Sequence, residues 1–301
     1  MKTFVTGAAG FVGSHICDSL LEQGHEVVGL DCFLDYYPRE LKEKNLEGAR
    51  RSGGFRFLEA DLVTASLSEL LAGVDVVFHQ AAQAGVRASW GDDFRIYSDN
   101  NVYATQRLLE ACRDSNIGRF VYASSSSVYG DTEDLPMREE SEKRPVSPYG
   151  VTKLAGEHLT WLYWRSYGLP AVALRYFTVY GPRQRPDMAF NRFIRAILEG
   201  RSISLYGDGS QSRDFTFISD IVAANVAAAT APAQGVVGEA FNIGGGSRTS
   251  VNEVISTVES ISGRSADVAR LEVQKGDVRH TAADTAKARQ RLGYVPEIGI
   301  E

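Results

Sequence analysis

The sequence predicts an α/β protein in which a Rossmann-type doubly wound parallel sheet is joined to a smaller C-terminal substrate-binding lobe. Three observations carry this prediction. Apolar runs alternate with helical segments up to residue 177, a glycine-rich turn follows the first run, and the alternation loosens afterwards. Such alternation indicates a parallel sheet covered on both faces, because parallel strands need helical crossovers.

The elements of the first domain can be placed by their apolar runs and end signals. The expected strands span residues 2–7, 26–31, 55–62, 75–82, 119–125 and 171–177. Helices are expected over residues 13–24, 66–73, 100–116 and 148–167. Gly24 ends the first helix, while Ser147 is an N-cap residue and Pro148 suits the first helical position of the last.

The rest of the chain is expected to form the lobe. Residues 178–190 are rich in Pro, Gly and Arg, and helices are expected at 190–199 and 219–230. We assign residues 1–177 to the first domain, with a return around 214–245, and 178–301 mainly to the lobe. The sequence stops abruptly for a folded domain at Glu301, so a further helix beyond that residue is expected.

Composition excludes several classes of function. The 301 residues are 44% hydrophobic and 23% charged, with a net charge of −6 and no basic run, so nucleic acid is not an expected partner. The scattered Cys17, Cys32 and Cys112 indicate neither a metal site nor disulfides and fit a reducing compartment. No apolar run approaches the roughly 18 residues of a membrane span. We expect a soluble cytoplasmic protein without a metal or a membrane partner.

Glycines at positions 7, 10 and 13 form a G-x-x-G-x-x-G turn between a strand and a helix. In this context the turn is typical of dinucleotide binding, because the helix N-terminus offers free N–H groups to a pyrophosphate. Asp31 ends the next strand, where a carboxylate can accept ribose hydroxyls and would repel a 2′-phosphate. NAD is therefore favoured over NADP. The predicted contacts of this cofactor are Gly7, Gly10, Phe11, Val12, Gly13, Asp31, Asp61, Leu62, Ala81, Tyr149 and Lys153.

Two of the neighbouring polar residues have alternative interpretations. Asp61 and Leu62 could meet the adenine ring, but Asp61 would serve equally well as a helix N-cap. His79 lies inside an apolar strand end, which favours a buried, hydrogen-bonded imidazole over a catalytic one.

Tyr149 and Lys153 lie four residues apart at the start of the helix beginning at Pro148, and therefore on one face. Free tyrosine has a pKa of about 10 and is a poor base at neutral pH. A neighbouring ammonium group and a nicotinamide cation would favour the phenolate and lower this pKa. Tyr149 could then accept a hydroxyl proton while hydride leaves the same carbon.

From Lys2 to about Tyr294 the chain resembles the extended short-chain dehydrogenase/reductases, specifically their nucleotide-sugar epimerase/dehydratase group. The resemblance implies tightly held NAD, a UDP- or dTDP-sugar substrate and a 4-keto intermediate. It assigns catalytic roles to Ser125, Tyr149 and Lys153. Dehydratases and decarboxylases of this group carry acidic residues just before "VYG", where this chain has Ser126 and Ser127.

The segments "AAQAGVRASW", "SSSSVYG", "SPYGVTK" and "RYFTVYGPRQRPDMAF" are similar to UDP-glucuronate 4-epimerases. We therefore expect Ser125, Ser126 and Ser127 to hold the sugar carboxylate, with Thr178 in the same pocket and Arg185 or its rival Arg87 adding charge. The alternative is that Ser126 and Ser127 only satisfy backbone groups at a strand end. The resemblance assigns Arg213 and Arg279 to the diphosphate, although either could form a surface ion pair with Asp214 or Asp277. The expected substrate contacts are Arg87, Ser125, Ser126, Ser127, Thr178, Arg185, Asn191, Arg192, Arg213, Asp277 and Arg279.

Helices 100–115 and 150–166 carry apolar bands broader than one core face needs, as in Leu154, Leu159, Trp161, Leu162 and Trp164. Related enzymes pair such helices in a dimer, so a homodimer is expected, with burial inside the monomer as the alternative. The expected activity is NAD-dependent 4-epimerisation of UDP-glucuronate to UDP-galacturonate without decarboxylation. A 4-epimerase of neutral UDP-hexoses or N-acetylhexosamines and a non-catalytic dinucleotide sensor are the competing hypotheses.

Overall fold

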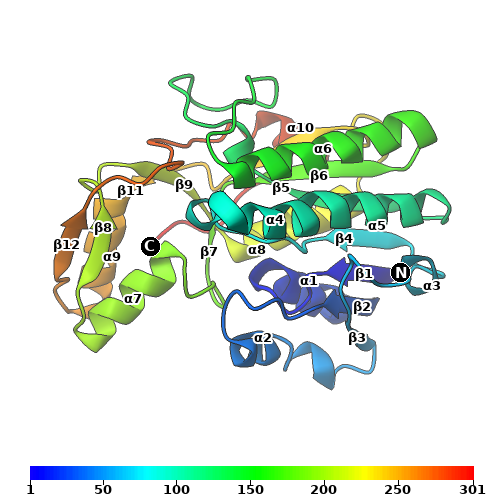
Figure 1. Ribbon diagram of the computed structural model, residues 1–301, viewed down its shortest axis with the longest axis horizontal. Coiled ribbons are helices and arrows are strands. Elements are labelled where there is room, and N and C mark those ends of the chain that lie inside the picture. The colour runs from blue at the N-terminus through cyan, green and yellow to red at the C-terminus, as the bar shows by residue number, and fades with distance from the viewer.

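A seven-stranded parallel sheet organises the chain, which the computed structural model describes from Met1 to Glu301 (Figure 1). The strand order is β10-β6-β5-β4-β1-β2-β3, so the fold class predicted from the sequence is confirmed. The order reverses between β1 and β4, and ligands of such sheets bind at the carboxyl ends of the strands beside this point. The strands are β1 (Lys2–Thr6), β2 (Glu26–Asp31), β3 (Phe55–Glu59), β4 (Val76–His79), β5 (Arg119–Ser125), β6 (Ala171–Tyr176) and β10 (Ala240–Ile243).

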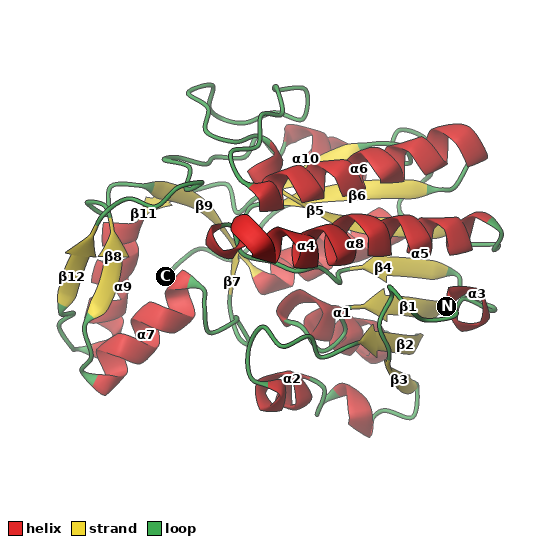
Figure 2. Ribbon diagram, in the orientation of Figure 1, coloured by secondary structure: helices red, strands yellow, loops and turns green.

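Helices cover both faces of this sheet (Figure 2). One face packs against α1 (Phe11–Glu22), α8 (Ile218–Thr230) and α10 (Ala286–Leu292) in a core that includes Ile16, Phe78 and Phe241. The other face packs against α3 (Leu67–Leu70), α5 (Ala104–Arg113) and α6 (Pro148–Tyr167). Strands β4 and β6 are buried along their whole length, because helices cover both faces of the sheet.

The smaller lobe is built from residues that follow β6. A three-stranded sheet contains β7 (Thr178–Tyr180), β9 (Ser212–Phe217) and β11 (Arg248–Ser250), and β8 (Ile203–Tyr206) pairs with β12 (Val268–Leu271). Helices α7 (Ala189–Glu199) and α9 (Val251–Ser262) complete an aromatic core around Phe190 and Phe215. The chain returns to the main sheet through α8 and β10, and again through α10, which packs on β10.

Several elements differ from their predicted bounds for local reasons. Helix α1 begins at Phe11 rather than at residue 13, because Gly10 serves as its N-cap. The helix expected at residue 100 is preceded by α4 (Phe94–Tyr97) and a π-helical segment, Ser98–Tyr103. Strands β3 and β4 end three residues early, where the chain turns toward the large cavity. Helix α2 (Arg39–Asn45) has no counterpart in the sequence prediction.

The remaining helical pieces are single 3₁₀ turns at Ala49–Arg51, Arg87–Ser89, Gly91–Asp93 and Ser126–Val128. None of the helices has the length and apolar character needed to cross a bilayer.

Candidate active site

A cavity of about 1170 Å³ opens at the carboxyl ends of β1, β4, β5 and β6, between the main sheet and the smaller lobe. Its walls include the glycine turn before α1, the serine turn after β5, the first turns of α6, and lobe residues 204–215 and 273–279. This volume exceeds that of a usual site for one small ligand, so two ligands can lie side by side in it.

The glycine turn requires its glycines for close backbone contact. Gly7 has a φ of +68°, and a Cβ on it would lie 2.8 Å from the Ala81 nitrogen. A Cβ on Gly13 would lie 2.1 Å from the Gly7 carbonyl oxygen. Gly10 caps α1 without a side-chain hydrogen bond, which leaves the first amides of the helix to face an anion. The turn therefore fits a dinucleotide pyrophosphate.

Asp31 lines the same cavity at the end of β2. Its carboxylate accepts hydrogen bonds from the Phe33 nitrogen (2.8 Å) and the Ala9 nitrogen (3.1 Å). Burial raises the pKa of Asp31, while these amides and the nearby Lys42 oppose the rise. Lys42 comes from α2, eleven residues after Asp31, where no sequence motif indicates a cation beside this carboxylate.

The other residues expected near the adenine also line the cavity, namely Asp61, Leu62 and Ala81. Asp61 accepts a hydrogen bond from the Val63 nitrogen (2.8 Å) within its own turn. Helix α3 begins only at Leu67, so Asp61 is not the N-cap of that helix.

His79 is fully buried under the site, as the sequence indicates. Its Nδ1 lies 2.8 Å from the Thr6 hydroxyl and its Nε2 lies 2.9 Å from the Thr105 hydroxyl. Burial and the charge of Lys153 lower the pKa of His79 to about 3. The imidazole is therefore neutral at physiological pH and occupied by structural hydrogen bonds.

The start of α6 places Tyr149 and Lys153 in the cavity. The Ser147 hydroxyl accepts a hydrogen bond from the Gly150 nitrogen (3.1 Å), and Pro148 occupies the first turn, so the helix begins where the sequence predicts. Burial raises the pKa of Tyr149, and a hydrogen bond with Ser125 only partly opposes this rise. Burial also lowers the pKa of Lys153 to about 7. In the protein alone the pKa of Tyr149 is therefore raised, because burial outweighs the effects of Ser125 and Arg185. The lowering expected from a nicotinamide cation concerns the complex with the cofactor.

The serine turn closes the end of β5 beside Tyr149. The Ser125 hydroxyl accepts a hydrogen bond from the Ser127 nitrogen (3.2 Å), so Ser125 caps the 3₁₀ turn that follows. Ser126 and Ser127 also line the cavity, and neither of their hydroxyls makes this capping bond. The turn thus offers neutral hydroxyl groups next to the tyrosine, with no carboxyl group in the three positions.

Arg185 and Thr178 reach the cavity from the lobe side. Arg185 pairs with Asp187 through hydrogen bonds of 3.0 and 2.9 Å, and the Tyr36 hydroxyl donates to the same carboxylate (3.2 Å). Neither Tyr36 nor Asp187 was expected from the sequence, because residue 36 lies 151 positions away from its partner.

The remaining expected arginines surround the outer part of the cavity, together with Arg192. Arg87 forms an ion pair with Asp277 (2.7 Å), which joins the main domain to the lobe. Arg213 donates to the Ser212 and Arg279 carbonyl oxygens rather than to a carboxylate. The Asp214 carboxylate is instead buried and accepts bonds from the Gly245 and Ala283 amides, and burial raises its pKa to about 6.

Asn191 is the one expected substrate residue that the structure does not bring into this cavity. Its side chain donates to the Gln184 carbonyl oxygen (2.8 Å), and it lines a separate hollow between α2 and α7. The sequence placed it correctly near the start of α7 but could not show that its amide is occupied by the preceding loop.

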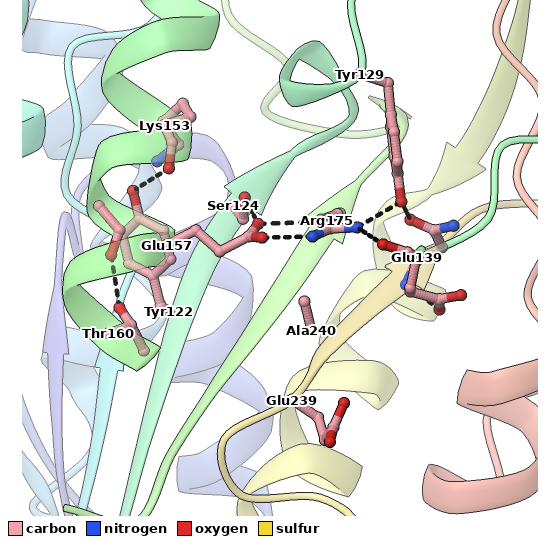
Figure 3. Close-up of polar contacts among 12 residues, drawn as sticks. Tyr122, Ser124, Tyr129, Glu139, Lys153, Glu157, Thr160, Arg175, Glu239 and Ala240 are labelled. Carbon is pink, nitrogen blue, oxygen red and sulfur yellow. Dashed lines mark hydrogen bonds and ion pairs between the residues drawn. The ribbon is translucent and has the colours of Figure 1, made fainter. Parts of the chain in front are cut away.

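Two buried polar residues behind the cavity were also missed. Asn101, in the π-helical segment, bonds to the Gln83 backbone and donates to the Thr152 hydroxyl (2.9 Å). Arg175, on β6, lies between Glu157 and Tyr129 (Figure 3). π-Helical turns often occur at functional sites, as the one that contains Asn101 does here, but no sequence signal identifies this turn.

Comparisons with known proteins agree with this geometry. Residues 3–244 match the NAD dependent epimerase/dehydratase family. A UDP-glucuronate 4-epimerase of Thermodesulfobacterium geofontis is 38% identical over 99% of this chain and 92% of its own length. An uncharacterized UDP-glucose epimerase, YtcB, of Bacillus subtilis is 49% identical over 100% of this chain and 95% of its own length. The crystal structure of a UDP-glucuronic acid 4-epimerase from Bacillus cereus with UDP-glucuronic acid and NAD has a TM-score of 0.97 and 46% identity, covering 100% of this chain and 95% of that one.

Proposed function

The chain belongs to the NAD dependent epimerase/dehydratase family, and we propose that it interconverts UDP-glucuronate and UDP-galacturonate with NAD as its cofactor. The observation that carries the proposal is the serine turn, which presents hydroxyl groups and no carboxylate beside Tyr149 in the cavity. The Bacillus cereus and Thermodesulfobacterium relatives support this choice of substrate.

The glycine turn and Asp31 would hold NAD, which would supply reversible hydride transfer at the sugar C4. The turn offers amides to the pyrophosphate, and the Asp31 carboxylate can accept ribose hydroxyls. Burial raises the pKa of Asp31, and the positive charge of Lys42 opposes part of this rise.

Tyr149 would exchange a proton with the C4 hydroxyl, since it shares a helix face with Lys153 and a hydrogen bond with Ser125. In the protein alone burial holds Tyr149 neutral. A cationic group arriving beside it would favour the phenolate, so ligand binding would activate this base. Ser125 would orient the hydroxyl whose proton is transferred.

The hydroxyls of Ser125, Ser126 and Ser127, with Thr178, would hold the sugar carboxylate. A 4-keto uronate has a ketone β to its carboxylate and loses CO₂ when the C5–C6 bond stands perpendicular to the carbonyl plane. Fixed hydrogen bonds to the carboxylate would hold that bond out of the perpendicular. Arg185 would attract the sugar carboxylate, and its ion pair with Asp187 balances its charge when no substrate is bound. The diphosphate would lie against Arg213, Arg279 and Arg192. Arg87 would leave its ion pair with Asp277 and bind the substrate instead.

The proposal is tested by incubating the purified protein with UDP-glucuronate without added cofactor and identifying the products. Formation of UDP-galacturonate from NAD that co-purifies with the protein is the expected result. Release of CO₂ with a UDP-pentose as the main product would contradict the role of the serine turn.

A second candidate is 4-epimerisation of a neutral UDP-hexose, which the Bacillus subtilis relative named as a UDP-glucose epimerase favours. In that case the serines would contact a 6-hydroxyl. Parallel assays with UDP-galactose separate the two substrates, because a site built for the carboxylate would give the higher kcat/KM with UDP-glucuronate.

We also propose a homodimer formed by the outer faces of α4, α5 and α6. Exposed apolar residues lie on α4, on the π-helical segment that leads into α5, and on α6, including Phe94 (42%), Tyr103 (50%), Val151 (49%), Trp161 (48%) and Leu162 (45%). Large exposed apolar patches are rare on monomers and often mark interaction surfaces. Light scattering on the purified protein should give twice the mass of the 32.9 kDa chain. The three free cysteines support a reducing, cytoplasmic location.

A further inference from the structure

A buried polar network around Arg175 reaches the cavity at Ser124, the residue directly before the serine turn (Figure 3). Its centre is Arg175 on β6, whose side chain is only 4% exposed. The guanidinium bonds to both carboxylate oxygens of Glu157, to the Tyr129 hydroxyl (2.7 Å) and to the Glu139 carbonyl oxygen (2.9 Å).

One side of this network is attached to the helix that carries the base. Glu157 lies four residues after Lys153 and eight after Tyr149, so the three side chains share one face of α6. The Ser124 hydroxyl also donates to Glu157 (2.7 Å), which connects the helix to the residue directly before Ser125. Burial favours the neutral acid, but the bonds from Arg175 and Ser124 outweigh it and lower the pKa of Glu157, so the pair is ionic.

The other side of the network is attached to the serine turn. Tyr129 follows this turn directly and is fully buried, and its hydroxyl donates to the Asn242 amide oxygen (2.6 Å) on β10. Arg175 therefore links three elements: the helix with Tyr149, the turn with Ser125–Ser127, and the strand at the edge of the sheet.

The helix and the turn also touch through their backbones, so small displacements are transmitted between them. A Cβ on Gly150 would lie 2.6 Å from the Ser127 carbonyl oxygen, and one on Gly156 would lie 2.2 Å from the Tyr122 hydroxyl. The Tyr122 hydroxyl donates to the Lys153 carbonyl oxygen (3.3 Å). Because Gly150 approaches the Ser127 carbonyl oxygen so closely, a shift of the start of α6 toward the serine turn would displace that turn.

We propose that Arg175 is a positioning residue that fixes the serine turn relative to the Tyr149 hydroxyl, and thereby holds the 4-keto uronate in a geometry that resists decarboxylation. Stability alone does not account for the ion pair, because buried pairs contribute little compared with apolar residues of similar size. A planar guanidinium that serves several partners in fixed directions instead determines orientation. This inference rests on the proposed function, since it concerns the carboxylate of that substrate.

Loosening the network has a defined chemical consequence. When the C5–C6 bond of the 4-keto sugar stands perpendicular to the C4 carbonyl plane, this bond can break and CO₂ leaves. The electron pair forms an enolate at C4–C5, and water supplies the proton that C5 then takes. The remaining UDP-4-keto-pentose either accepts the hydride or departs, in which case the cofactor stays reduced.

The test compares Arg175→Lys and Tyr129→Phe with the parent and with Arg119→Lys. Arg119 is a matched control, since it is a buried arginine at the opposite end of β5 that bonds only to the Ala228 and Ala231 carbonyl oxygens. Lysine keeps the charge of Arg175 but loses the fork of donors, and Tyr129→Phe removes one hydroxyl. The measurements are kcat, KM, the ratio of CO₂ to UDP-galacturonate, the fraction of reduced cofactor and the melting temperature.

For Arg175→Lys we expect kcat to fall by up to about 100-fold, the cost of a misplacement of roughly 1 Å, with little change in KM. Both network variants should raise the ratio of CO₂ to UDP-galacturonate and the fraction of reduced cofactor. Arg119→Lys should lower the melting temperature while keeping the product ratio of the parent. Unchanged kcat and product ratios in both network variants, or the same rise in Arg119→Lys, would overturn the inference.

Failure of the proposed function gives a different result. If the parent does not turn over UDP-glucuronate but epimerises UDP-galactose, the proposed substrate is wrong, and with it the assigned resistance to decarboxylation. A fall in kcat of Arg175→Lys on UDP-galactose, without one in Arg119→Lys, would still support positioning of Tyr149. If the parent epimerises UDP-glucuronate and the network variants match it, only the positioning role is wrong.

Discussion

The cavity has a wall formed by the main sheet and an outer wall formed at the junction with the smaller lobe, and the ion pairs of the two sides differ in burial. Behind the sheet wall, the Arg175–Glu157 pair has side chains 4% and 12% exposed and makes further hydrogen bonds to Ser124 and Tyr129. On the outer wall, the Arg87–Asp277 pair has side chains 43% and 24% exposed and joins two lobes. Solvent-screened pairs of the second kind exchange partners at little cost, whereas a buried pair does not. The sheet wall thus suits chemistry, and the outer wall suits ligand capture.

Among substitutions on the sheet wall, removal of the Tyr149 hydroxyl should have the largest effect on activity. For Tyr149→Phe we expect kcat to fall by about 10³-fold, within the usual range for loss of a general acid–base group. Melting temperature and NAD content should match the parent, because only one hydroxyl is lost. Initial rates measure the effect, and a variant with most of its activity would remove Tyr149 from the mechanism.

Substitution in the glycine turn should be next in size. In Gly13→Ala the new Cβ would meet the Gly7 carbonyl oxygen at 2.1 Å. We expect a loss of about 1–3 kcal/mol in the free energy of unfolding and a loss of bound NAD. Gly53→Ala is the matched control, since nothing lies within 4 Å of its Cβ. Equal NAD content in both variants would contradict the assigned cofactor site.

An acidic residue in the serine turn tests the choice of substrate. Ser127→Glu should lower kcat/KM for UDP-glucuronate by about 10- to 100-fold, because two carboxylates would share one pocket. Ser127→Ala controls for loss of the hydroxyl alone. If kcat/KM for UDP-galactose falls as much as that for UDP-glucuronate, the turn does not contact the carboxylate.

The buried His79 predicts how stability depends on pH. Its pKa of about 3 in the folded protein lies below the ordinary value of 6.5. The unfolded chain therefore binds an extra proton between these pH values, and stability falls as pH drops below about 6.5, by up to about 1.4 kcal/mol per pH unit. Urea unfolding at pH 7.5 and 5.5 should show a smaller difference for His79→Gln than for the parent. An unchanged difference would assign the acid sensitivity to other groups.

The smallest effect is expected on the outer wall. Arg87→Ala should change the free energy of unfolding by less than about 1 kcal/mol, because the pair is exposed. KM should rise several-fold with kcat unchanged, the pattern expected for loss of binding that is equal in ground and transition states. A fall in kcat at constant KM would contradict the assignment of the outer wall to ligand capture alone.

The predictability of the site follows the same division between local and tertiary features. The glycine turn and the Tyr149–Lys153 pair are local, because one turn or one helix face brings their residues together. The contacts of Lys42 and Arg175 join residues that are distant in the sequence, so no local spacing predicts them.

Two residues show effects of the tertiary structure that local spacing does not predict. Burial raises the pKa of Tyr149 in the protein alone, and it outweighs the effects of Ser125 and Arg185. Asn191 stands near the correct loop, but its amide is used by Gln184. The fold class was predictable throughout, because strand and helix signals alternate along the chain and both faces of the sheet are apolar.

The fate of the substrate's carboxyl carbon tests the central claim most directly. The protein, with its own cofactor, is given UDP-glucuronate labelled with ¹³C at C6, and the products are followed by NMR. We predict that the label stays in a carboxylate and divides between glucuronate and galacturonate signals. Label that emerges chiefly as bicarbonate would contradict the account. So would label that stays in the glucuronate signal while the same protein epimerises UDP-galactose in a parallel assay.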